Sequence, residues 1–380
     1  ISYYYVDQQA TKDNLLYPAG SNTIYPVAQY PNLFPNGVVG NPEYKEEQAR
    51  LNLDGEFTGL NNHIMRAGLG FFWGDIYEVT EQKNFLPNLL PRPNGLEEVA
   101  DTPEVFLPEK GRTNHSIYGQ DEWLFAPQWV LTTGVRYDHY SDFGDTVNPR
   151  LALVWANNNQ MTTKLLYGRA FRAPSISELF VTANPVTLGN PNLDPETIDT
   201  YEFAFSHQVS PHLNYNTNVF YYQINDFILF EFDPISFSKQ AQNFGQIAGH
   251  GLEYEFSYEA ADNLKLLGHY SYQKTQDQTH GGRLGNTPSQ ELYLRSEWQL
   301  TSNYSLNTQI NWVGEQSRTY NDDRQPVASY TTVDFNLMAK NLIQSATMKL
   351  IIKNAFNADV REASQASLKP FYQKAFVPND

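Results

Sequence analysis

Residues 306–312 read Leu-Asn-Thr-Gln-Ile-Asn-Trp, and this stretch decides the fold class. Successive side chains of an extended chain point to opposite faces. Leu306, Ile310 and Trp312 therefore share one face, and the three amide side chains between them share the other. The stretch predicts a β-strand with one apolar and one strongly hydrophilic face.

The same alternation recurs along the whole chain. In residues 127–140, one face holds Leu131, Val135 and Tyr137, and the other holds Thr132, Gly134, Arg136 and Asp138. Residues 213–222 repeat the pattern, with apolar side chains opposite asparagines. Roughly fourteen or fifteen segments of about ten residues follow it. The sequence predicts an all-β protein built as an antiparallel up-and-down sheet.

The connection lengths distinguish a membrane barrel from a soluble sandwich or propeller. Short links such as Asn61-Asn62, Ser210-Pro211 and Thr301-Ser302-Asn303 alternate with long links that span roughly 7–45, 74–113, 171–196, 316–327 and 357–380. If the strands run up and down, every short link lies at one end of the sheet and every long link at the other. Outer-membrane barrels have this arrangement of short periplasmic turns and long extracellular loops, whereas Greek-key sandwiches have no reason to sort their loops in this way.

The two longest connections are rich in proline. The first holds Pro18, Pro26, Pro31, Pro35 and Pro42, and the second holds Pro87, Pro91, Pro93, Pro103 and Pro108. Proline at this density disfavours strands and helices and stiffens a loop. We expect loops that cover the barrel mouth and lose little entropy on closing over a ligand. Stiff surface loops without that role are the alternative.

Composition agrees with an outer-membrane barrel. The 380 residues include 25 Tyr and 23 Phe but no Cys, and only 18% are charged. Such barrels carry aromatic girdles at both membrane interfaces. No run approaches the roughly 18 apolar residues of a membrane-spanning helix, and the mean hydropathy is −0.53. Neither the length of apolar runs nor the mean hydropathy detects a barrel strand, because its apolar residues alternate with polar ones. The net charge of −16 argues against a nucleic-acid partner.

Two motifs resemble the barrel domain of TonB-dependent receptors of Gram-negative bacteria. The first ends a strand at 166–172 and continues as Arg172-Ala173-Pro174. The second comprises Asn190, Pro191, Leu193, Pro195 and Glu196, ahead of a strand that ends at 201–205. Together they form a specific signature of that family. Weaker stretches at 118–123, 134–139, 148–151 and 353–357 have the order and spacing of its ferric-siderophore and cobalamin branches, so the resemblance covers essentially the whole chain.

The resemblance implies a transmembrane β-barrel of about 22 strands, plugged by an N-terminal domain that contacts TonB. On that view residues 1–380 are a partial barrel domain. It would begin near the seventh strand and stop in the last extracellular loop, without the plug, the early strands or the final strand. One departure is Asp194, where the family often has a lysine. A salt bridge made by that lysine is therefore in doubt here.

Motifs for catalysis or metal binding are not apparent. The histidines, among them His63, His139, His212, His250 and His280, lack a ligand spacing such as His-Glu-x-x-His. Gly281-Gly282 lies in a loop without the strand and helix of a phosphate cradle. We predict neither an enzyme, nor a cofactor, nor a metal site. Calcium at the acidic loop residues Asp142, Asp145, Asp322 and Asp323 is an alternative to solvated charges.

Polar residues of one parity should line the barrel interior. Arg50, Asn52, Asp54 and Glu56 share a parity, and so do Glu253 and Glu255. Such ladders would hold a plug through hydrogen bonds and line the route of the substrate. A water-filled porin needs the same polarity.

Aromatic and basic residues near the mouth are the candidates for ligand capture, because flat rings stack on catecholates or porphyrins and arginine pairs with anionic chelates. The candidate set is Trp73, Tyr77, Tyr140, Arg169, Phe171, Arg172, Arg318, Tyr320 and Arg324. The alternative for the aromatics is the outer interfacial girdle. For Arg169 and Arg172 the alternative is anchoring of the motif loop.

The expected function is that of a high-affinity outer-membrane receptor. It would bind a ferric siderophore or similar iron chelate outside the cell and admit it to the periplasm. The resemblance implies that TonB supplies energy from the inner-membrane proton gradient. The expected partners are TonB, outer-membrane lipid and the iron chelate, without nucleic acid. The alternatives are a receptor for cobalamin or another large nutrient, a passive porin, and a soluble all-β binding module.

Overall fold

The protein is almost entirely antiparallel β-structure. The computed structural model describes residues 2–8, 13–19, 33–158, 160–234, 238–279, 281–285, 287–318, 322, 324–341 and 346–363. Its long strands are β1 (Ser2–Gln8), β3 (Val38–Phe57), β4 (His63–Lys83), β6 (Lys110–Ala126), β7 (Trp129–Tyr140), β8 (Gly144–Asn158), β9 (Met161–Arg172), β11 (Glu196–Ser210), β12 (Leu213–Asn225), β15 (Ile247–Ala261), β16 (Leu264–Asp277), β18 (Gln290–Gln299), β19 (Tyr304–Val313), β20 (Tyr330–Ala339) and β21 (Met348–Ile352).

Short elements occupy the connections. They are β2 (Leu15–Tyr17), β5 (Glu97–Glu98), α1 (Ile176–Phe180), β10 (Thr187–Leu188), β13 (Ile228–Asp233), β14 (Ser238–Asn243) and β17 (Gly282–Arg283). Strands β10, β14 and β13 make a separate three-stranded sheet. Strands β2, β5 and β17 are additions to the main sheet of eighteen strands. The other fifteen match the predicted number of alternating segments.

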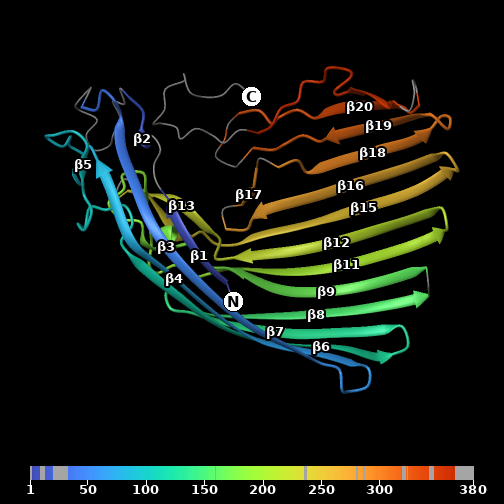
Figure 1. The fold of residues 1–380 in the computed structure, drawn as a ribbon, viewed down its shortest axis with the longest axis horizontal. Coiled ribbons are helices and arrows are strands. Elements are labelled where there is room, and N and C mark those ends of the chain that lie inside the picture. Colours follow the sequence, from blue (N-terminus) through green and yellow to red (C-terminus); the bar gives the residue numbers. More distant parts are fainter. Residues whose placement is uncertain are drawn as a thin grey trace.

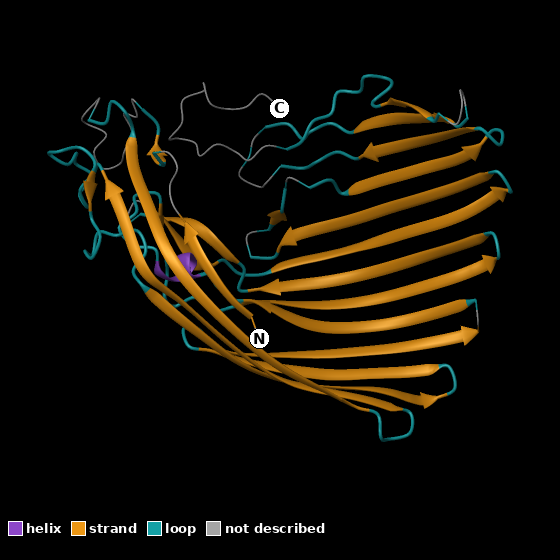
Figure 2. Ribbon diagram, in the orientation of Figure 1, coloured by secondary structure: helices purple, strands orange, loops and turns teal. Residues whose placement is uncertain are grey.

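The long strands pair with their neighbours in chain order, so the predicted antiparallel up-and-down topology is confirmed. Figures 1 and 2 show that this sheet is strongly curved, as in the wall of a β-barrel. Within the described ranges no pairing joins β1 to β21. In those ranges no helix is long and apolar enough to cross a bilayer.

The links at one end of the sheet are short, as predicted. Asn62 and Gln128 adopt left-handed conformations there, at φ 66° and 73°. The opposite end carries the long loops. One short link also lies at that end, against the prediction that short and long links lie at different ends. Residues 141–143 join β7 to β8 in a tight turn, followed by Gly144 at φ 94°. Short hairpin loops of this kind use a glycine in the left-handed region, so the prediction that every short link lies at the other end is wrong at this hairpin.

Strands extend further into two predicted loops than expected. The loop predicted for 7–45 already becomes β3 at Val38, and the loop predicted for 74–113 begins only after Lys83 and ends at Lys110. Pro42 lies inside β3, opposite Glu81. Neither β1 nor β2 pairs with Pro42 on its other side, and a strand tolerates a residue without an N–H at such a place.

The convex surface of the wall is apolar. Leu53, Leu69, Ile117, Tyr137 and Val147 are successive partners across five strands, and their exposed fractions run from 40% to 68%. Val135 is likewise half exposed. Because no second layer formed by the described residues covers these side chains, they form the lipid-facing belt of a transmembrane barrel.

Aromatic rings border the belt at the end with the short turns. His63 stacks on Trp123 at 5.4 Å, and Trp129 stacks on Trp155 at 5.1 Å. Nearer the loops, Tyr167, Tyr201 and Tyr221 form a second row of neighbouring rings. Two aromatic rows on either side of an apolar band are the girdles of a membrane barrel.

The buried apolar side chains cluster at the loop end. One cluster contains Ile76, Val79, Val105, Leu107 and Val181. Others form around Phe34, Val38 and Phe85 and around Leu179, Leu193, Ile228 and Ala241. These clusters give the long loops a core of their own, separate from the lipid-facing belt.

Candidate functional site

A pocket of about 450 Å³ lies on the concave side of the wall at the loop end. Apart from Phe71, the residues of four neighbouring strands that line it share one parity, and the start of the loop after β9 completes the lining. The lining includes Arg50 and Asn52 of β3, Phe72 and Gly74 of β4, Lys110, Arg112, Asn114 and Ser116 of β6, Arg136 and Tyr140 of β7, and Ala173, Ser175 and Ile176. The pocket therefore joins the barrel interior to the motif loop.

A β-bulge at Tyr77 fixes which residues of β4 face this pocket. Glu46 pairs with Ile76 while Lys45 pairs with Glu78, so Tyr77 is the extra residue. A bulge shifts the alternation by one position. Before it, Phe72, Gly74 and Ile76 face inward. After it, the inward positions change parity, and Val79 is buried in the loop core.

Three of the four cations in the pocket wall lie over an aromatic ring. Arg50 is 4.9 Å from the ring centroid of Phe72, and Lys110 is 4.9 Å from that of Phe180. Arg112 lies 5.8 Å from Tyr140. An aromatic face attracts a cation within about 6 Å. The rings thus hold the cationic groups in place while leaving part of each available.

Only some of these cations are neutralised. Arg112 donates from Nε to Asp142 at 2.6 Å, and Arg136 makes two bonds of 2.8 Å with Asp138. Arg50 and Lys110 make no ion pair with a carboxylate in the described part of the chain. Glu46 also lines the pocket, but these two cations outnumber that one carboxylate. The pocket therefore retains positive charge beside aromatic rings, which suits an anionic ligand with flat groups.

The motif loop is held to the sheet by Arg172. Its guanidinium binds Glu196 through two bonds of 2.7 Å and Glu178 at 2.9 and 3.1 Å. Ser175 caps α1, and Glu178 completes the capping box. Burial opposes ionisation of Glu178, but hydrogen bonds from Arg172 and Ser175 outweigh it and hold its pKa below the ordinary value. This network sets the position of Ser175 and Ile176 in the pocket wall.

A buried lysine ties together the loops beyond the pocket. Lys83 and Glu81 are each 2% exposed, with Nζ 3.3 Å from Oε2. Lys83 also donates to the carbonyls of Glu104 and Ala183 at 2.5 and 2.7 Å. Glu81 accepts a bond from the Phe106 amide. The loops at 84–109 and 173–195 are therefore joined in one packed unit, rather than being free to close separately over a ligand.

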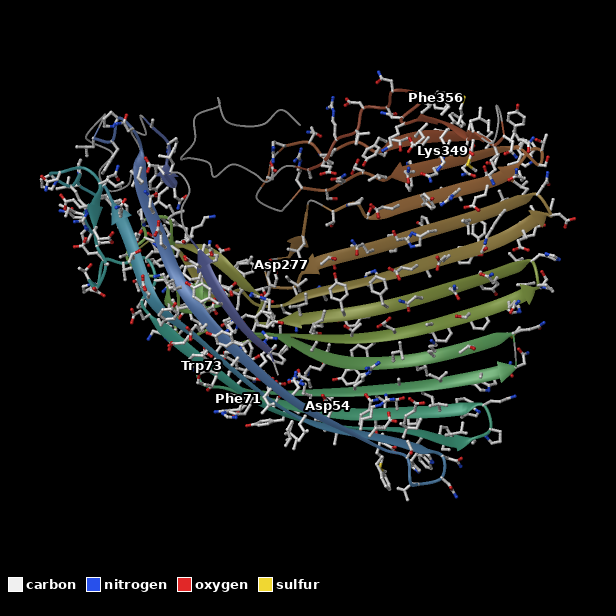
Figure 3. The ribbon with its side chains drawn as sticks, in the orientation of Figure 1. Asp54, Phe71, Trp73, Asp277, Lys349 and Phe356 are labelled. Carbon is white, nitrogen blue, oxygen red and sulfur yellow. The ribbon has the colours of Figure 1, made fainter. Side chains whose placement is uncertain are left out.

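Of the nine predicted ligand-binding residues, Tyr140 lines the pocket. Trp73 and Tyr77 do not, and Figure 3 places Trp73 with Phe71 on the convex side of the wall. Arg169 has the outward parity of Leu165 and makes a two-bond pair with Asp199 at 2.9 Å. Tyr167 donates to the same carboxylate. These positions match the alternatives of an interfacial girdle and a structural arginine.

The remaining candidates lie elsewhere. The Phe171 ring contacts Tyr140 edge-on at 6.0 Å, next to the pocket. Arg318 is buried and donates to the Gln325 carbonyl, and Arg324 binds Asp322. The hydrogen bonds from Arg324 lower the pKa of Asp322 to about 2. Tyr320 lies outside the described residues.

The sequence reasoning missed Lys110, Arg112 and Phe72. The two cations were assigned to a loop, yet β6 begins at Lys110. The signal was present, because Lys110, Arg112, Asn114 and Ser116 alternate like the polar face of every other strand.

The acidic loop residues considered for calcium mostly bind protein side chains. Asp142 binds Arg112, and Asp145 accepts bonds from Tyr137 and His139, each at 2.6 Å. Asp323 lies outside the described residues. Among the described residues, no group of three or more His, Asp or Glu side chains is arranged to hold a metal ion.

Comparisons with known proteins agree with this architecture. A family described as TonB dependent receptor-like, beta-barrel, matches residues 2–354. The iron-regulated outer membrane virulence protein of Vibrio cholerae is 25% identical over 267 residues, which cover 64% of this chain and 41% of that protein. The ferric enterobactin receptor of Pseudomonas aeruginosa is 28% identical over 232 residues, or 53% of this chain and 30% of that receptor.

A solved structure shows the same fold. The siderophore receptor PirA from Acinetobacter baumannii superposes with a TM-score of 0.64 at 15% identity, covering 93% of this chain and 55% of that one. The chain thus spans about half the length of that receptor and 41% of the Vibrio relative.

Proposed function

This chain belongs to the TonB-dependent receptor family, and from that membership we propose that it serves in the uptake of an anionic iron chelate, a ferric siderophore, across the bacterial outer membrane. Its relatives include a ferric enterobactin receptor, a siderophore receptor and a heme/hemopexin utilization protein. TonB would supply the energy for transport, and outer-membrane lipid would surround the apolar belt.

The observation that carries the proposal is the pocket wall of cations over rings. Arg50 and Lys110 each combine an adjacent aromatic face with a positive charge that no carboxylate among the described residues pairs. A ferric catecholate or carboxylate chelate offers negative charge on flat groups, and cation and ring together match both properties. A neutral nutrient such as cobalamin would gain less from the two cations. The pocket therefore supports an iron chelate over cobalamin.

The experiment is a binding comparison on the intact receptor in outer-membrane vesicles. Ferric enterobactin, haem and cobalamin are titrated separately, and the dissociation constants are compared. We expect the anionic ferric chelate to bind most tightly. We also expect Arg50→Gln to weaken that binding about tenfold, a loss of roughly 1.4 kcal/mol for one charged contact. Equal affinity for all three probes would refute the iron-chelate assignment while leaving the barrel intact.

A passive porin gives a different result in the same vesicles. It would admit small solutes without saturable binding and without dependence on TonB. Saturable binding of the ferric chelate in the vesicles, together with uptake by whole cells that stops when TonB is deleted, supports the receptor.

A further inference from the structure

The tyrosine row near the loops continues across two more strands of the convex face. Tyr167, Tyr201 and Tyr221 are successive cross-strand partners, and the next two partners are His250 of β15 and Lys274 of β16. Directly opposed residues of neighbouring strands lie on the same face of a sheet, so His250 and Lys274 also point outward. Both strands are paired on either side. This surface is therefore part of the outside of the barrel and not a sheet edge.

The row climbs from the short turns toward the loops. Followed from Tyr167 in the other direction, it passes through Leu151, Thr133 and Asp121 to Met65. Met65 lies two residues after the start of β4 at a short turn, whereas Lys274 lies three residues before the end of β16 at the loops. The tilt of strands in a membrane barrel produces such a climb. His250 and Lys274 therefore lie on the loop side of the tyrosines, in the layer of lipid headgroups.

No described carboxylate neutralises Lys274 on this face. Among the described residues of the wall strands from β11 to β20, Asp199 is the only carboxylate of outward parity. It lies three strands away from Lys274 and accepts two bonds from Arg169. A lysine on the lipid face is costly within the hydrocarbon and tolerated near an interface. There a lipid phosphate can take the place of the missing carboxylate.

A pocket of about 270 Å³ adjoins Lys274. Tyr272 and Gln290 have the same outward parity and line it, and Gln290 accepts a bond of 3.0 Å from Tyr270, which also points outward. Thr287 adds a hydroxyl group. Of the described residues that line this pocket, only Lys274 is charged. Hydroxyl and amide groups around one ammonium suit a phosphate carried on a sugar, because both parts form hydrogen bonds.

The convex face near β3 and β4 has a different charge. Glu47 and Asp75 are direct partners with outward parity. Lys45, which also points outward, is bound to Glu78 at 2.7 Å. Carboxylates at this place repel an anionic headgroup. An anionic lipid is therefore favoured at β15 and β16 over β3 and β4.

We propose that Lys274 and His250 bind the phosphate group of a glycolipid in the outer leaflet of the membrane. The two residues are direct partners across β15 and β16, so one phosphate can contact both. His250 is exposed, and its imidazole can donate a hydrogen bond. The long loops of such barrels lie outside the cell, which makes the adjoining leaflet the outer one. The inference needs the barrel to lie in a membrane, but it does not need the iron chelate.

The test titrates the full-length receptor in mild detergent with lipid A, and native mass spectrometry measures the retained lipid. We expect the wild type to bind lipid A more tightly than lipid A from which the phosphates have been removed. Lys274→Gln should weaken binding of lipid A about fivefold, as expected for one lysine at an anionic surface. Lys274→Arg should restore most of the affinity. Heat-modifiable migration on gels verifies that each variant folds.

The matched control is Lys45→Gln, because Lys45 also points outward but is already paired with Glu78. This variant should bind lipid A like the wild type. Unchanged binding by Lys274→Gln overturns the inference, and so does an equal loss in Lys45→Gln or equal retention of the phosphate-free lipid. A wild-type receptor that retains lipid A but binds no ferric chelate refutes the proposed function and supports this inference, so the two failures are distinguishable.

Discussion

Arg172 and Glu196 are direct partners across β9 and β11, and their side chains are joined by two hydrogen bonds of 2.7 Å. One residue comes from the Arg-Ala-Pro motif and the other ends the Asn-Pro-x-Leu-x-Pro-Glu motif. The long loop between them therefore starts and finishes at a single ion pair. Glu196 also accepts the Ile228 amide, which ties the β13–β14 hairpin to the same point.

Replacing Arg172 should impair folding more than binding. Arg172→Ala leaves Glu178 and Glu196 without their cation, at 14% and 11% exposure, and we expect a loss of about 1–3 kcal/mol. The measurement is the yield of heat-modifiable barrel compared with the dissociation constant of the folded fraction. Arg169→Ala, which removes a pair on the convex face, is the control. A variant with normal yield and weakened binding would show that Arg172 contacts the ligand.

Gly189 should not tolerate a side chain. A Cβ there would lie 2.7 Å from backbone atoms of Leu179, Phe180 and Val181, and backbone atoms at that distance cannot move aside cheaply. We expect Gly189→Ala to separate the loop from α1, measured as faster proteolysis within 173–195 on intact cells. Gly119→Ala, with nothing within 4 Å of its Cβ, should be cleaved like the wild type. Equal protection of both variants would contradict the close approach.

The effects of replacing Lys83 and Glu81 on stability should be strongly non-additive. Lys83→Met leaves a buried carboxylate without its cation, which costs about 3–5 kcal/mol in other proteins. The double variant Lys83→Met/Glu81→Gln removes both charges and should recover much of that loss. Hydrogen exchange of the amides in 99–109 reports the effect. If the single and double variants exchange at the same rate, the pair does not hold the two loops together.

A charge on the convex belt should block assembly into the membrane. Val147→Lys places an ammonium among exposed apolar side chains, at a cost of about 2–4 kcal/mol if it lies near the middle of the bilayer. Asn148→Lys places the same charge on the inner face and should be tolerated. The amount of folded protein in outer-membrane fractions compares the two. Similar amounts would mean that the convex side does not face lipid.

Acid should loosen the loop around α1. The folded-state pKa of Glu178 is below its unfolded value of about 4.3. Its contribution to stability is therefore complete above that value and is lost as the pH falls through the folded pKa. Limited proteolysis at stepwise lower pH should show increasing cleavage near α1 below about pH 4. Glu178→Gln should remove this dependence, and an identical pH profile in that variant would assign the effect to another group.

The sequence predicted the strands, their lipid-facing and inner faces, and the short turns. Each of these follows from a rule that operates over neighbouring residues, since alternation with a period of two needs only the local chain. The sequence could also have assigned Arg169 and Arg172 to opposite faces of the sheet, because residues three apart on a strand point to opposite sides. The predicted ligand-binding set ignored this parity and so mixed convex and concave positions.

Only the tertiary structure decided which side chains meet in the pocket. Arg50, Phe72, Arg112 and Tyr140 come from four strands, and their meeting depends on the registers between those strands. The bulge at Tyr77 and the tight turn at 141–143 also depend on the pairing of one strand with another. Alternation along a single strand fixes the face of each residue, but not which residue of the neighbouring strand lies beside it. That register is set by hydrogen bonds between segments far apart in the chain.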